Sequence, residues 1–218
     1  EDTLSLHDAL PIYDTWEFFC ELKTAYPQFG YMWECPNMLS IDGVDILLFC
    51  PQGLKQQGHK YSNIYQSGYI AGKLNDTINL FKHGEFTELD NGFDFYAPQA
   101  FTHANRTILI GWAGLPELEA DYPTSKNGWL HSLTLPRQLN YKNYHLYQTP
   151  IIELEKLRQA SFKYNGKADN FVRELPRVCE IHFALPPDCF EYFLITLSFG
   201  KEQIRLSYNE ESNEICID

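Results

Sequence analysis

The chain has 218 residues, of which 44% are hydrophobic and 15% aromatic. This composition suits one large or two small globular domains and excludes an intrinsically disordered chain. The 29 acidic residues against 17 basic ones give a formal net charge of −12. That charge argues against general binding of nucleic acid or of anionic membrane surfaces, and no apolar run reaches the roughly 18 residues of a membrane span. The expected partner is therefore a neutral or locally recognised small molecule.

The first twelve residues are set apart from the fold. Residues 3–12 read TLSLHDALPI, which is the translation of a common DNA-sequencing adapter, and such segments are excluded from fold reasoning. The true N-terminus is then expected to be missing, so the sequence gives no information on a signal peptide. The C-terminal ICID stops inside an expected strand.

Residues 13–146 show the pattern of an all-β protein. Short apolar runs alternate with Gly, Pro, Asn and Asp, and helical periodicity is almost absent. The expected strands include YMWEC, DILLFC, SGYIAG, DFYAP, TILIGWAG and LHSLTL.

Two segments of this region repeat one another. Residues 33–50, WECPNMLSIDGVDILLFC, align without a gap with residues 95–112, FYAPQAFTHANRTILIGW, at an offset of 62 (98 − 36 for the prolines). A hairpin repeated at a fixed period is typical of radial or solenoid repetition, and residues 67–75 and 78–86 would supply the other two strands of a propeller blade. A third unit is expected to begin at residues 127–136, NGWLHSLTLP. The alternative is that two hairpins resemble each other by chance.

The pattern changes after residue 146. Residues 147–160 predict a short helical or extended linker, with Thr149 as a possible N-cap and Pro150 at the first helical position. Strand patterns return at residues 178–186, 189–200, 202–209 and 214–218, which favours a partial β-sandwich over residues 161–218. The expected fold is a partial five-bladed propeller over residues 13–146 followed by this truncated sandwich.

The six cysteines show no metal or disulfide framework. They include no Cys-x-x-Cys pair, so they are predicted to be reduced thiols in the core. The seven histidines are scattered, and none stands at helical ligand spacing. Neither a metal nor a cofactor is expected.

Glu34 places one carboxylate inside the otherwise apolar run GYMWECPNML at residues 30–39. The inner strands of a propeller end at its central channel, so a carboxylate at this position suits a pocket. An apolar surrounding would favour its protonated form, as a general acid requires. The alternative is a glutamate in a structural hydrogen-bond network.

The repeat-related segment LDNGFDFYAPQ, residues 89–99, gathers polar groups beside aromatic rings. Asp90, Asp94, Tyr96 and Gln99 could bind sugar hydroxyls, and Trp112 could form a wall against the sugar ring. Turn chemistry explains Asp90 equally well, and Trp112 could be part of the core.

The motifs together resemble glycoside hydrolase family 32, the invertases and sucrose-6-phosphate hydrolases. They are WECP at 33–36, DNGFDFYAPQ at 90–99, GW at 111–112 and NGWLHSLTLPR at 127–137. The resemblance implies a five-bladed propeller followed by a β-sandwich. It also implies that Glu34 is the acid/base of a retaining β-fructofuranosidase and that Cys35 tunes it. Trp33, Asp90, Asp94, Tyr96, Gln99 and Trp112 are further implied at the substrate.

Two catalytic motifs of that family do not occur in this sequence. The N-D-P-N-G motif carries the nucleophile, and an R-D-P motif carries a transition-state-stabilising aspartate. The chain alone is therefore expected to be inactive, with both carboxylates lying outside it. Pro98 and Gln99 follow the bacterial pattern, which favours a bacterial cytoplasmic enzyme. The alternatives are an arabinan-cleaving propeller glycosidase and a non-catalytic protein that binds fructans or other carbohydrates.

Overall fold

The computed structural model describes residues 18, 20–75, 77–117, 122–167, 169, 171–185 and 191–218. The adapter-like residues 1–12 lie outside this described part. The chain divides into two compact units, residues 1–158 and residues 159–218. Strands and turns dominate both units, which confirms the predicted all-β class.

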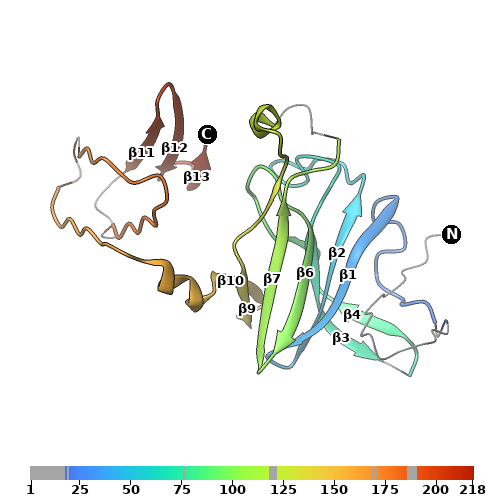
Figure 1. Cartoon of the computed structure of the whole chain (residues 1–218). Helices are drawn as coiled ribbons and strands as arrows, with labels where there is room; N and C mark the ends of the chain where they lie inside the picture. The colour runs from blue at the N-terminus through green and yellow to red at the C-terminus, as the bar shows by residue number, and fades with distance from the viewer. Residues whose placement is uncertain are drawn as a thin grey trace. The chain divides into compact units, whose positions relative to one another are not determined.

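The first sheet is antiparallel and follows the order β1-β2-β3-β4 (Figure 1). Its strands are β1 (Met32–Ile41), β2 (Val44–Gln52), β3 (Gly68–Asn75) and β4 (Leu80–His83), and the short β5 (Thr87–Glu88) also pairs with β3. The two further blade strands predicted at 67–75 and 78–86 are thus confirmed as β3 and β4.

The second sheet repeats this arrangement with the order β6-β7-β9-β10. Its strands are β6 (Tyr96–His103), β7 (Arg106–Ala113), β9 (Arg137–Lys142) and β10 (His145–Pro150).

The prediction that a third unit begins at residues 127–136 is wrong. The short strand β8 (Ser132–Leu133) pairs with β7, and the Thr134 amide donates to the Gly111 carbonyl at 2.9 Å. Because the open edge of β7 accepts this segment, residues 132–137 lead into the outer strands of the second sheet.

The repeat at an offset of 62 extends to the details of the backbone. The ladder between β1 and β2 shifts register between Glu34 and Asn37, and the ladder between β6 and β7 shifts between Tyr96 and Gln99. Cys35 (φ 50°) and Ala97 (φ 46°), each followed by a proline, have left-handed backbone at these bulges. The two hairpins are therefore one structural unit used twice.

Strands β1 and β6 lie side by side, so the first strands of the two sheets face each other (Figure 1). The inter-sheet cluster joins both sheets through buried apolar side chains, namely Ile41, Ile46, Leu48, Tyr69, Leu89, Phe95, Leu109, Leu139 and Leu146. The outer cluster covers the other face of the first sheet and consists of Leu47, Phe49, Tyr61, Ile70, Phe81 and Phe86. This packing is that of two successive propeller blades with their first strands innermost.

Residues 147–160 are partly helical, but the predicted start is wrong. Thr149 and Pro150 pair with Gln138 and Arg137 and end β10. A 3-10 helix, η2 (Ile152–Leu157), follows with Ile151 at its N-cap. Thr149 and Pro150 pair with the open edge of β9, whose backbone groups need hydrogen-bond partners. This pairing outweighs the preference of these residues for the start of a helix. A second 3-10 helix, η1 (Pro123–Asn127), precedes β8.

The second unit contains one antiparallel sheet with the order β11-β12-β13. Its strands are β11 (Tyr192–Phe199), β12 (Glu202–Asn209) and β13 (Glu214–Ile217), as the strand patterns predicted. The strand predicted at 178–186 is wrong over its described residues 178–185, which are exposed and irregular. A β-sandwich at residues 161–218 stays a prediction.

The thiols do not share one environment. Cys50 is buried, as predicted, and Cys20 and Cys35 are half-buried, whereas Cys179 and Cys216 are exposed. Cys189 lies outside the described residues. No helix in the described part of the chain has the length and hydropathy needed to cross a bilayer.

Candidate functional site

The carboxylate of Glu34 is the centre of a hydrogen-bond network between the two sheets. The Tyr96 hydroxyl donates to Glu34 Oε2 at 2.6 Å, and the Gln52 side-chain amide donates to the same oxygen at 2.8 Å. The Gln52 amide also donates to the Tyr96 hydroxyl at 2.9 Å. No hydrogen bond to Oε1 is found within the described residues. Both hydrogen bonds of the Glu34 carboxylate within the described residues therefore go to Oε2.

The repeat explains how these groups meet. Glu34 and Tyr96 occupy equivalent positions of the two hairpins (96 − 34 = 62), and each stands directly before a bulge. A bulge rotates a strand locally and re-aims the side chains next to it. Two repeated hairpins with facing first strands thus point their equivalent side chains at each other.

Asn37 ties the two bulges together. Its amide nitrogen donates to the Cys35 carbonyl at 2.8 Å and to the Pro98 carbonyl at 3.4 Å. Its side-chain oxygen accepts the Ala100 amide at 2.9 Å. Because this buried side chain contacts both strands, it fixes the separation of β1 and β6 beside the carboxylate.

Cys35 lies next to Glu34 and close to Cys50. The neighbouring Cys50 thiol lowers the pKa of Cys35, against the opposing effects of burial and of the Glu34 charge, and Gln99 adds a further lowering hydrogen bond. The same contact with Cys35, together with burial, raises the pKa of Cys50. The structure thus brings Gln99 to Cys35, the neighbour of Glu34, and the roles of Cys35 and Gln99 at the site stay predictions.

Aromatic rings surround the anchored carboxylate on the side of the second sheet. Burial, and then the hydrogen bond to Glu34, raises the pKa of Tyr96, so its hydroxyl stays protonated and donates. The Tyr96 ring lies 5.5 Å from that of Tyr65 and 6.4 Å from that of Trp112, measured between centroids. Trp112 is therefore near the site and half-buried, and its contact with a substrate stays a prediction.

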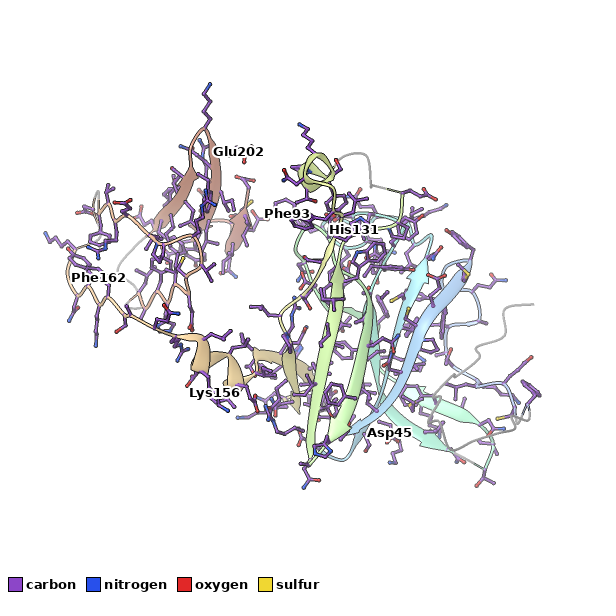
Figure 2. All side chains as sticks on the ribbon, viewed as in Figure 1. Asp45, Phe93, His131, Lys156, Phe162 and Glu202 are labelled. Atoms are coloured by element: carbon purple, nitrogen blue, oxygen red, sulfur yellow. The ribbon has the colours of Figure 1, made fainter. Side chains whose placement is uncertain are left out.

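A chain of aromatic contacts leads from Trp112 to Asp94. The Trp112 and His131 rings are 4.8 Å apart, and the His131 and Tyr122 rings are 4.7 Å apart. The Tyr122 hydroxyl donates to Asp94 Oδ2 at 2.6 Å. Burial, and then this bond, raises the pKa of Tyr122 to about 12. Figure 2 shows His131 at one end of the first unit and Asp45 at the other. The aromatic contacts around His131 therefore lie at the end of the unit opposite Asp45.

Asp90 is held in a structural network. Its Oδ2 forms an ion pair with Arg137 at 2.7 Å, and its Oδ1 accepts the Gly92 amide at 2.8 Å. Arg137 also stacks over the Phe95 ring and donates to Gln148. The turn chemistry considered for Asp90 is thus present, and binding of a sugar by Asp90 stays a prediction.

Trp33 is not brought to the carboxylate. Its indole stacks on Phe49 at 4.1 Å and donates to the Phe29 carbonyl at 2.6 Å, so it packs against the outer cluster. Successive residues of a strand face opposite sides of the sheet, and this separates Trp33 from Glu34. A direct contact of Trp33 with substrate stays a prediction.

Sequence reasoning missed Gln52, Asn37 and Tyr65. Gln52 ends strand β2 and Asn37 lies within strand β1, and both are buried polar side chains, which must find hydrogen-bond partners. No local pattern identified their distant partners, because Gln52 bonds to Glu34 at a separation of 18 residues and Asn37 accepts the Ala100 amide at a separation of 63 residues. Among the described residues, no group of three or more His, Cys, Asp or Glu side chains is arranged to hold a metal ion.

The comparisons with known proteins agree with this geometry. A family model described as the N-terminal domain of glycosyl hydrolases family 32 matches residues 10–150. The chain belongs to glycosyl hydrolase family 32. A sucrose-6-phosphate hydrolase from Staphylococcus xylosus is 43% identical over 210 residues, which cover 93% of this chain and 42% of that protein.

Two solved structures of the family share the fold. A mutant β-fructofuranosidase from Bombyx mori, in complex with sucrose, superposes with a TM-score of 0.70 at 26% identity, over 88% of this chain and 41% of that one. A sucrose-6-phosphate hydrolase from Lactobacillus gasseri superposes with a TM-score of 0.55 at 37% identity, over 60% and 27% of the two chains. The present chain thus spans less than half the length of these relatives.

Proposed function

We propose that this chain is part of a retaining glycosidase that cleaves the β-fructofuranosyl bond of sucrose or of sucrose 6-phosphate, with Glu34 as the acid/base. The observation that carries the proposal is the Glu34 carboxylate held through Oε2 by Tyr96 and Gln52, with Oε1 left for proton transfer. The sucrose-6-phosphate hydrolases among the relatives and the sucrose complex of a neighbour support the choice of substrate.

The proposed reaction uses Glu34 twice. Glu34 first gives its proton to the glycosidic oxygen that leaves, while a second carboxylate attacks the fructosyl carbon. Glu34 then takes a proton from the water that releases the fructosyl-enzyme. A retaining site places its two carboxyl groups about 5 Å apart. No N-D-P-N-G motif occurs in this sequence, so the proposal assigns the nucleophile to a residue outside it.

Further residues have proposed roles at the sugar. Trp112 and Asp94 stand at the two ends of the aromatic chain, so a ring contact and hydroxyl hydrogen bonds are assigned to them respectively. Gln99 is exposed at the second bulge and could add an amide contact. A cytoplasmic location in a bacterium remains part of the proposal, supported by bacterial relatives.

The test compares Glu34→Ala with the parent in the full-length protein that carries this chain. Loss of an acid/base lowers kcat on sucrose by about 10²- to 10⁴-fold. A substrate with an activated leaving group, such as β-fructofuranosyl fluoride, needs no proton and should retain its first step. Added azide should then restore turnover and yield β-fructofuranosyl azide, because the small anion attacks without a general base.

Glu88→Ala is the matched control, since Glu88 is also a half-buried carboxylate but accepts the Tyr61 amide away from the site. This control should show no azide rescue. Failure of azide to rescue Glu34→Ala, in a folded variant, would contradict the acid/base role. Sucrose hydrolysis by the 218-residue chain alone would contradict a nucleophile outside it.

A further inference from the structure

We propose that Gln52 is a positioning residue that makes Oε1 of Glu34 the oxygen which carries the catalytic proton. This inference rests on the proposed function, because it concerns the same carboxylate. Gln52 ends strand β2 and is 6% exposed, so its amide has been removed from water and must be satisfied inside the protein.

Every polar atom of the Gln52 side chain has a partner. The Nε2 group donates to Glu34 Oε2 at 2.8 Å and to the Tyr96 hydroxyl at 2.9 Å, and because these two acceptors are only 2.6 Å apart they share one N–H group. The Oε1 atom of Gln52 accepts the Tyr31 hydroxyl at 2.9 Å. The Tyr96 hydroxyl donates its hydrogen to Glu34 Oε2, and its oxygen accepts the hydrogen bond from Gln52.

These contacts fix the orientation of the amide. Rotation of the Gln52 amide by 180° would turn its carbonyl oxygen towards the Glu34 carboxylate, and two sets of lone pairs would then face each other. It would also leave the Tyr31 hydroxyl facing an N–H group. The acceptor-only carboxylate therefore sets the orientation of the amide, and the Tyr31 hydroxyl supports it by donating to the amide oxygen.

The consequence for Glu34 is an inequality between its two oxygens. Oε2 accepts two strong donors, which stabilise negative charge on that atom. A proton placed on Oε2 would displace one of these donors and would itself need an acceptor. The proton of the neutral acid is therefore assigned to Oε1, for which no hydrogen-bond partner is found within the described residues.

Several titratable groups lie beside Glu34 or in the network of side chains around it and contribute to what a pH profile reports. They are Cys35 on β1, Cys50 on β2, Tyr96 on β6, and Tyr31, Tyr65 and Glu117 in loops. The pKa values of Tyr65 and Tyr96 are raised, so these hydroxyls remain neutral near neutral pH. The pKa of Cys35 is lowered, so the profiles are also measured in a Cys35→Ala background.

The experiment uses Gln52→Met, which keeps the length of the side chain and removes its donors, in the full-length protein. Loss of a donor to a charged group should lower kcat on sucrose by about tenfold or more, with KM changed less than about threefold. The basic limb of the kcat profile should move up by about one pH unit, because the ionised carboxylate loses a donor. Turnover of β-fructofuranosyl fluoride in the first step should stay near that of the parent.

Gln52→Glu sharpens the test, since it keeps the shape and brings a second carboxylate to Glu34. It should move the basic limb further in the same direction than Gln52→Met does. If Gln52→Met does not fold, Gln52→Glu carries the same comparison.

Gln66→Met is the matched control. Gln66 is also buried, at 4% exposure, but its side-chain amide donates to the Asn63 carbonyl and not to Glu34. It should lose stability without any shift of the pH profile. Equal losses on both substrates and an unmoved basic limb in the Gln52 variants would overturn the positioning role. If Glu34→Ala is rescued by azide and Gln52→Met behaves like Gln66→Met, only this inference fails, and absence of azide rescue indicates failure of the proposed function.

Discussion

Strands β2 and β7 are the same strand of two repeated hairpins, but their surroundings differ. In β2 all residues from Ile46 to Gln52 are buried, because the inter-sheet cluster lies on one face and the outer cluster on the other. In β7 buried and half-buried residues alternate, and only Leu109 enters the inter-sheet cluster. The comparison shows that one sequence pattern builds the hairpin, while the neighbouring layers decide its burial.

The same comparison holds at the bulges. Both hairpins have left-handed backbone before a proline, at Cys35 and at Ala97. One hairpin carries Glu34 before its bulge and the other carries Tyr96, and the two side chains bond across the sheets at 2.6 Å. The repeat therefore places two equivalent side chains opposite each other, and because they differ in type, a tyrosine donates to a glutamate.

The largest expected effect is a loss of stability on truncating a buried side chain of β2, which should exceed the loss at the equivalent position of β7. Leu48→Ala removes a fully buried side chain of β2 and should lower the free energy of unfolding by about 2–5 kcal/mol. Ile110→Ala, at the equivalent half-buried position of β7, should cost about half as much. Urea unfolding of both variants measures this difference. Equal losses would mean that the second face of β7 is as well covered as that of β2.

A smaller effect distinguishes the two hairpin turns. Gly43 has φ +81° and open space around its absent side chain, so Gly43→Ala should cost about 1 kcal/mol through backbone strain alone. Asn105 occupies the equivalent position with φ 60°, where Asn105→Gly should be nearly neutral. Thermal unfolding checks both, and a large loss in Asn105→Gly would indicate a side-chain role for Asn105.

The smallest effect depends on pH. Asp45 accepts the Leu74 amide at 2.9 Å and pairs with Lys73 at 3.0 Å, while Thr107, its equivalent in the second hairpin, bonds to Thr102 instead. Burial alone would raise the pKa of Asp45, but the Leu74 amide and Lys73 outweigh it and lower the pKa.

A lowered pKa in the folded state stabilises the protein above the unfolded value of about 4, and this contribution is lost as the pH falls through the folded value. Asp45→Asn should therefore cost less than about 1 kcal/mol at pH 7 and nothing once Asp45 is protonated. Urea midpoints at pH 7 and at a pH low enough to protonate Asp45 in the folded protein measure this change. Thr107→Val, which loses only a neutral hydrogen bond, should show the same loss at both values.

Much of the fold could be predicted because its signals are local. Alternating apolar residues and the Asp42-Gly43 turn define the first hairpin, and an ungapped match places the second. The segment at 127–136 could not be assigned correctly, because its pairing with Gly111 and Trp112 depends on an open edge of β7. Thr149 was misassigned as a helix cap for the same reason, since the edge of β9 was available to it.

The candidate site was predictable in part. Glu34 stood out because a charge in an apolar strand needs a reason; Tyr96 bonds to it and Cys35 follows it in the chain, while Gln99 contacts Cys35 and Trp112 lies by Tyr96. The sequence by itself determined the two hairpins and the carboxylate between them, because strand alternation, turns and prolines act over a few residues. Only the tertiary structure decided that Gln52 anchors Glu34 and that Trp33 turns away, because those outcomes depend on which faces of two sheets meet.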